Sequence, residues 1–173
     1  FGQDATGEVY VLDYFNGGIY VIRPVAASGI FPERLSDIPA LLAAGGGIDQ
    51  TGSGILPYVP GAKLWTDGAL KERFMALPNL TQIQFTLSGG WDFPDQSVLI
   101  KNFILPLDER DPDHTGKRLE TRLMLLLDGQ WYGFSYEWND QETDAILLPA
   151  GKTRPIDIVD RDGRALTVNY QYP

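Results

Sequence analysis

The most regular alternation of apolar and polar positions lies between Arg118 and Trp138. Two runs with a period of two flank Asp128-Gly129, a dipeptide that accepts the positive φ angles of a tight type I′ turn. The pattern predicts a long β-hairpin, with Arg118, Glu120 and Arg122 on a polar face. The residues predicted to share the opposite, buried face are Leu119, Thr121, Leu123, Leu125, Leu127, Tyr132, Phe134, Tyr136 and Trp138.

Shorter alternating runs predict more strands on both sides of this hairpin. They are separated by short turn segments rather than by helical patterns, which favours an all-β fold of the β-sandwich or jelly-roll type. The predicted strands are 8–14, 19–23, 82–87, 98–105 and 145–148, with two more around Ile156–Ile158 and Leu166–Tyr170.

Composition shifts predict three parts: a terminal β-hairpin over 1–24, a linker over 25–54 and a β-sandwich module over 55–173. The linker contains one short helix candidate. Ser36 or Asp37 is suited to cap it, Pro39 suits its first turn, and the glycines at 45–47 end it.

The chain has 173 residues and a formal net charge of −9. Because such a charge repels phosphate backbones and anionic lipid head groups, we expect neither a nucleic-acid nor a membrane partner. Zero cysteines exclude disulfides, Cys-ligated zinc, iron–sulfur clusters and a thiol nucleophile. The single histidine, His114, leaves little for a histidine-rich metal site or a catalytic triad.

Asp111 and Asp113 lie in the most acidic loop and are spaced like the start of a calcium-binding loop. Glu120 comes two positions too early for the bidentate ligand of that loop. Calcium binding and a solvated hairpin loop are the two interpretations, and the second fits a run of charges.

Four charged residues near the open end of the central hairpin are the catalytic candidates: Glu120, Arg122, Asp140 and Asp144. Paired carboxylates beside aromatic residues are what a glycosidase or lyase requires. The alternative is structural, since Glu120 and Arg122 are neighbours on one strand face and Asn139-Asp140 can form a turn.

Aromatic residues near turns could stack on sugar rings. Trp65 and Trp131 are the two that we expect to be exposed and to bind a glycan. Packing in the core is the alternative for aromatic residues that alternate along strands.

Two stretches resemble known families. FGQDATGEVYVLDYFNGGIYVIRP, residues 1–24, is similar to the last blade of quinoprotein sugar dehydrogenases of the glucose/sorbosone type. From Ile55 onward, ILPYVPGAKLWTDGALKERFMALP, GGWDFPDQSVLIKNF, RLETRLMLLLDGQWYGFSYEWNDQETDAILL and VNYQYP resemble, in order, a module of uncharacterised bacterial secreted proteins. In that family the module joins a sugar-dehydrogenase-like β-propeller to a cytochrome c domain.

The resemblance implies a periplasmic or extracellular location, with the rest of a propeller and a cytochrome c domain as partners. None of that family's quinone-binding or haem-binding residues falls in this chain, so we expect no cofactor here; calcium binding at Asp111 and Asp113 is the alternative given above. The first functional hypothesis is a non-catalytic structural or docking module of a sugar-dehydrogenase-like redox protein. The second is a carbohydrate-binding or carbohydrate-cleaving β-sandwich.

Overall fold

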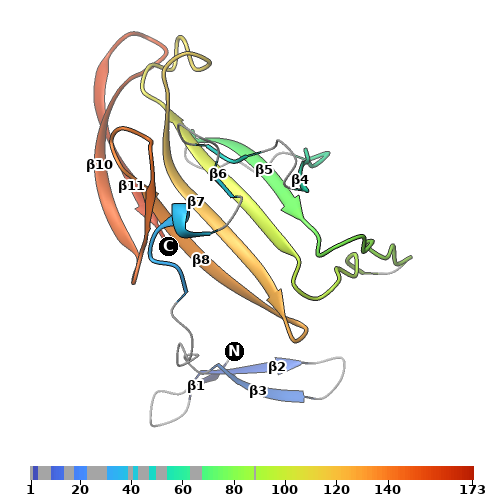
Figure 1. Cartoon of the computed structure of the whole chain (residues 1–173). Helices are drawn as coiled ribbons and strands as arrows, with labels where there is room; N and C mark the ends of the chain where they lie inside the picture. Colours follow the sequence, from blue (N-terminus) through green and yellow to red (C-terminus); the bar gives the residue numbers. More distant parts are fainter. Residues whose placement is uncertain are drawn as a thin grey trace. The chain divides into compact units, whose positions relative to one another are not determined.

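The computed structural model describes residues 31–38, 41–42, 47–49, 54–62, 68–87 and 89–173, together with the backbone of three N-terminal strands (Figure 1). The chain divides into two compact units, Phe1–Phe31 and Pro32–Pro173. Within the described residues, no helix is long and apolar enough to cross a membrane.

The first unit contains an antiparallel sheet of three strands in the order β1-β2-β3. The hairpin predicted within 1–24 is confirmed as β2 and β3, and its turn lies outside the described residues. The strands are β1 (Gly2–Gln3), β2 (Val9–Asp13) and β3 (Gly18–Ile22).

The second unit is built on a six-stranded antiparallel sheet in the order β4-β5-β6-β7-β8-β9, with the two-stranded sheet β10-β11 as a second layer (Figure 1). Within each sheet, strands that follow one another in the sequence are also neighbours in space. This confirms the all-β prediction. The strands are β4 (Ile55–Pro57), β5 (Leu70–Ala76), β6 (Val98–Pro106), β7 (Gly116–Leu127), β8 (Gln130–Trp138), β9 (Ala145–Leu147), β10 (Lys152–Val159) and β11 (Ala165–Tyr172).

The predicted central hairpin is confirmed as β7 and β8. Asp128 and Gly129 have φ angles of 49° and 72°, as a type I′ turn demands. Leu123 and Tyr136 are buried, with 3% and 0% of their surface exposed.

A β-bulge changes the predicted faces of β7. Phe103 pairs with Glu120, but Ile104 pairs with Arg118, so Leu119 has no partner on β6. A bulge places two successive side chains on the same side of a sheet. The predicted burial of Leu119 is confirmed, but Leu119 packs with Phe103 and not on the face of Thr121. The prediction is wrong for Glu120, which is fully buried instead of solvent-facing.

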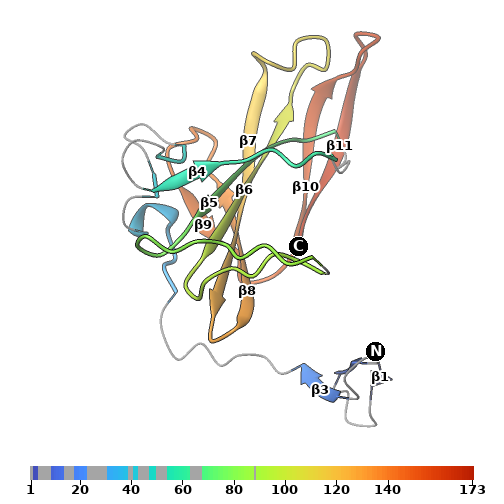
Figure 2. The same cartoon turned by 90° about the vertical axis from the view of Figure 1, so that its right-hand side faces the viewer.

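The two faces of the six-stranded sheet are covered by different parts of the chain (Figure 2). We call them the Tyr136 face and the Arg122 face. On the first lies the segment that begins at Pro32, whose carbonyl accepts a hydrogen bond from the Tyr136 hydroxyl at 2.7 Å. Buried residues from this segment are Leu35, Leu41 and Ile48.

The β10-β11 hairpin covers only one end of the Arg122 face. Its contribution to the core is Ile158, Tyr170 and Tyr172, which pack with Phe103 and Leu119. The other end of this face, toward the β7-β8 turn, is left uncovered by β10 and β11 and forms the floor of a groove described below.

Two local predictions are wrong. The helix expected after Ser36 is a 3-10 turn, η1 (Leu35–Asp37), and Leu42 forms an antiparallel bridge with Ile48 where the helix was expected to continue. The segment expected to form a strand over 82–87 is a loop that, among the described residues, makes a single bridge, Gln84 to Asp92, and pairs with none of the described strands.

Candidate functional site

The catalytic candidates Glu120 and Arg122 form an ion pair whose carboxylate is buried and whose guanidinium is partly exposed. Arg122 donates two hydrogen bonds to the Glu120 carboxylate, at 2.7 and 3.0 Å. Tyr170 of β11 donates a third, at 2.8 Å. The Glu120 side chain has no exposed surface, and Arg122 lies over the Phe103 ring at 4.3 Å. This carboxylate therefore has three hydrogen-bond donors and is shielded from solvent.

The pKa shifts around this network follow from burial and charge. Burial, reinforced by the Glu120 charge and hydrogen bond, raises the pKa of the Tyr170 hydroxyl well above its usual value. Burial lowers the pKa of Arg122, but hydrogen bonds and attraction to Glu120 outweigh it and the net shift is upward. Both groups keep their protons, so they act as fixed donors to Glu120.

The other two catalytic candidates have partners of their own. Asp140 accepts hydrogen bonds from Lys117 at 2.7 Å and Arg154 at 2.8 Å, which lower its pKa to about 2. Asp144 accepts from the Ser36 hydroxyl at 2.8 Å and from the Ala145 backbone at 2.8 Å. The three carboxylates that were catalytic candidates, Glu120, Asp140 and Asp144, thus each bind different partners and do not form one catalytic centre.

A chain of polar side chains crosses the Tyr136 face through four strands. The Trp138 indole donates to Thr121 at 2.8 Å, and the Thr121 hydroxyl donates to Asn102 at 2.6 Å. Asn102 in turn donates to Glu72 at 2.9 Å. Because Asn102 and Thr121 are fully buried, these bonds fix the register of the sheet centre rather than forming an open site.

The acidic loop contains the two candidates for metal binding, Asp111 and Asp113. Asp111 contacts the ring of His114, with Oδ1 2.7 Å from Nδ1, and its carbonyl accepts from the Thr115 hydroxyl. Asp113 is exposed. Among the residues that the structure describes, no three Asp, Glu or His side chains gather as ligands of a metal ion.

Of the two glycan candidates, Trp65 lies outside the described residues. Trp131 is 37% exposed and packs edge-on against Phe93, with ring centroids 5.6 Å apart. Trp91 is 57% exposed on the loop that precedes β6. Trp138 and Tyr136, two further aromatic residues of β8, are core residues.

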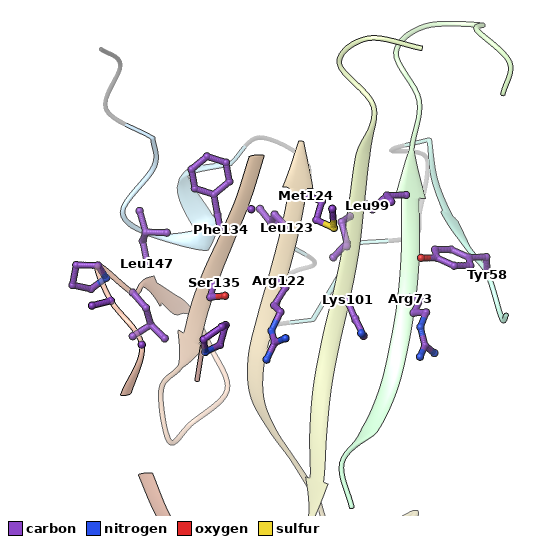
Figure 3. A pocket seen from close by; sticks show the side chains of 17 residues that line it. Tyr58, Arg73, Leu99, Lys101, Arg122, Leu123, Met124, Phe134, Ser135 and Leu147 are labelled. Atoms are coloured by element: carbon purple, nitrogen blue, oxygen red, sulfur yellow. The ribbon is translucent and has the colours of Figure 1, made fainter. Parts of the chain in front are cut away.

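The uncovered end of the Arg122 face forms a groove of about 830 Å³ (Figure 3). Its floor comes from β5 to β8. One wall is the segment after β9 together with the end of β11, and Tyr58 lies on the other side. The side chains that matter below are Arg73, Leu99, Lys101, Arg122, Met124 and Ser135, with Leu147 and Pro149 in the wall.

Three cationic side chains lie in one row across the groove floor (Figure 3). Arg73 pairs with Lys101 across β5 and β6, and Lys101 pairs with Arg122 across β6 and β7. Burial and then repulsion by Arg73, Lys71 and Arg122 lower the pKa of Lys101, despite the opposing effect of Glu120. Sequence reasoning missed this row because its members come from three separate segments, and only the strand register brings them together.

The apolar part of the groove adjoins this row. Leu99 pairs with Met124, and Met124 with Gly133, so the next row of the floor is apolar and contains a position without a side chain. A Cβ atom placed on Gly133 would meet nothing within 4 Å. The groove therefore combines concentrated positive charge with an adjacent apolar surface.

Comparison of the chain with protein-family models, curated proteins and solved structures finds no match.

Proposed function

We propose that the chain is a non-catalytic docking and binding module of a secreted, multidomain redox protein. The proposal rests on one observation: every carboxylate that was a catalytic candidate already forms hydrogen bonds or ion pairs within the protein. Glu120 is buried and holds Arg122 and Tyr170, while Asp140 and Asp144 hold loops and strand ends in place. These carboxylates therefore stabilise the arrangement of the strands and loops.

The pKa of Asp140 supports a structural role. An efficient general acid or base has a pKa near the working pH, whereas two cationic neighbours hold this carboxyl group at about 2. At neutral pH the Asp140 carboxyl group is ionised, so it cannot act as a general acid. Its low pKa also makes it a weak general base.

The redox context is supported by the resemblance of the segment after Ile55 to a module between a sugar-dehydrogenase-like propeller and a cytochrome c domain. In this proposal the propeller and cytochrome parts carry the quinone, the haem and the electron transfer. The module holds the two together in the periplasm or outside the cell. Exposed apolar residues of the loop before β6, Leu80, Phe85 and Leu87, offer contact area for such a neighbour.

The test is dye-linked sugar oxidation by the purified chain with added pyrroloquinoline quinone and calcium, run beside an absorbance scan for bound cofactor. We expect no turnover by the chain alone, and association with the separately expressed propeller or cytochrome part of the parent protein. Sugar turnover by this chain alone, or no association with either part, would contradict the proposal.

A second candidate is glycan binding at Trp131, which the exposed indole favours. Titration with soluble polysaccharides, followed by tryptophan fluorescence, separates the two. A Trp131→Ala variant should abolish the response if the glycan stacks on this ring. An equal response in the variant would assign it to another tryptophan.

A further inference from the structure

The cationic row on the groove floor lacks sufficient counter-charge within the protein. Arg122 is paired with Glu120, but in the described part of the chain neither Arg73 nor Lys101 forms an ion pair. Nearby carboxylates have other partners: Glu137 pairs with Lys152 and Arg154. Two cations of the row therefore face the groove without an anion.

This row of cations destabilises the folded protein when no anion is bound in the groove. Like charges directly opposite each other on neighbouring strands repel, and here the repulsion occurs twice, between Arg73 and Lys101 and between Lys101 and Arg122. The chain as a whole carries a net charge of −9, so the concentration of positive charge is opposite to its overall sign. An anionic ligand in the groove would relieve this repulsion.

We infer that the groove binds a small organic anion with an apolar body. Adjacent strands are about 4.8 Å apart, so a carboxylate or phosphate group can contact two neighbouring cations of the row at once. The apolar part of the ligand then lies over Leu99 and Met124, against Leu147 in the wall. A volume of about 830 Å³ falls in the range of small-molecule sites.

This inference is independent of the proposed redox context, since it concerns only the groove and its charges. A carboxylate and a phosphate share the required chemistry, and titration with one ligand of each kind distinguishes them. The experiment is calorimetric titration at low ionic strength with decanoate and with decyl phosphate, below their micelle concentrations. Decyl maltoside supplies the same tail with a neutral head, and acetate and inorganic phosphate supply the heads without a tail.

We expect one molecule of decanoate or decyl phosphate to bind per chain, and the tighter of the two identifies the head group. Acetate and inorganic phosphate should bind at least about tenfold more weakly, because they leave the apolar surface uncovered. Added salt should weaken binding, as for any interaction that rests on exposed charges. Decyl maltoside binding as tightly as the anions would overturn the inference, and so would the absence of binding by both anionic amphiphiles.

Three variants localise the ligand. Arg73→Gln and Lys101→Gln should each lower the affinity about tenfold or more, since each removes one charge-assisted hydrogen bond. Gly133→Leu should block the groove without changing the charge, because open space surrounds its Cβ position. Arg164→Gln in the β10-β11 loop is the matched control: it removes one positive charge far from the groove and should leave the affinity unchanged.

Thermal unfolding of each variant without ligand checks that the fold is retained. Unaltered binding by Gly133→Leu would place the anion elsewhere and overturn the inference. An acidic peptide such as a glutamate decamer, binding more tightly than either amphiphile, would also overturn it and would assign the groove to a polypeptide partner.

Discussion

Tyr170, two residues before the end of β11, donates a hydrogen bond of 2.8 Å to Glu120 at the bulge of β7. This contact joins the second layer of the sandwich to the centre of the six-stranded sheet. Glu120 is in turn held by Arg122, whose other side faces the groove. The covering hairpin thereby also fixes one cation of the groove floor.

Tyr170→Phe should destabilise the protein by about 1–3 kcal/mol, because it leaves a fully buried carboxylate with one donor fewer. The free energy of unfolding in urea measures this. Tyr132→Phe is the control, since the Tyr132 hydroxyl has no hydrogen bond in the described part of the chain. Equal stability of Tyr170→Phe and wild type would mean that Glu120 does not depend on the second layer.

The ion pairs of Asp140 should make the protein acid-sensitive. Hydrogen bonds from Lys117 and Arg154 lower the pKa of Asp140 from 3.8 to about 2 in the folded state. The folded state therefore binds the proton less readily than the unfolded state, so this contribution to stability is present above about pH 4 and is lost as the pH falls toward 2. The free energy of unfolding, measured in urea at pH 7, 4 and 2.5, should fall less on acidification for Asp140→Asn than for wild type.

Asp162→Asn is the matched control for that measurement. It removes one carboxylate that, in the described part of the chain, forms an ion pair only with Arg164 in an exposed loop. If Asp140→Asn and wild type lose stability in parallel below pH 4, the contacts of Asp140 do not contribute in solution.

Leu123→Ala should lower the free energy of unfolding by about 2–5 kcal/mol, as truncation of a buried leucine does. Leu127→Ala, four residues along the same strand, is an internal control. The sequence predicts the same buried face for both, but Leu127 is 38% exposed at the end of the hairpin, so its truncation should cost much less. Similar costs for the two would contradict this difference in burial.

The features that could be predicted from sequence are those determined by neighbouring residues. The β7-β8 hairpin follows from the turn preference of Asp128-Gly129 and from the period of its flanks. The same reasoning fails at 82–87, where Phe85 and Leu87 alternate correctly but 72% and 98% of their surfaces are exposed. Alternation shows that a segment can form a strand, whereas a partner strand decides whether it does.

The candidate sites depended on pairing between distant segments and were largely missed. Burial of Glu120 results from the bulge opposite Phe103 and Ile104, which is a property of two strands together. The row of Arg73, Lys101 and Arg122 likewise requires the register of β5, β6 and β7. No window along the sequence contains either arrangement.

A last prediction concerns the wall of the groove, where Gly151 packs against the end of the chain. A Cβ atom on Gly151 would lie 2.9 Å from the carbonyl carbon of Pro173 and 3.1 Å from the carbonyl oxygen of Tyr172. These neighbours are backbone atoms, so they cannot move aside as a flexible side chain would. Gly151→Ala should therefore displace the end of β11 and destabilise the protein by about 1–3 kcal/mol.

Gly133→Ala provides the opposite case on the groove floor. Nothing lies within 4 Å of its Cβ position, and replacing a glycine inside a strand by alanine is expected to stabilise by about 0.5–1 kcal/mol. The same substitution at two positions of one groove should thus change the urea midpoint in opposite directions. If Gly151→Ala proves as stable as Gly133→Ala, the end of β11 does not pack against Gly151, and the groove loses this wall in solution.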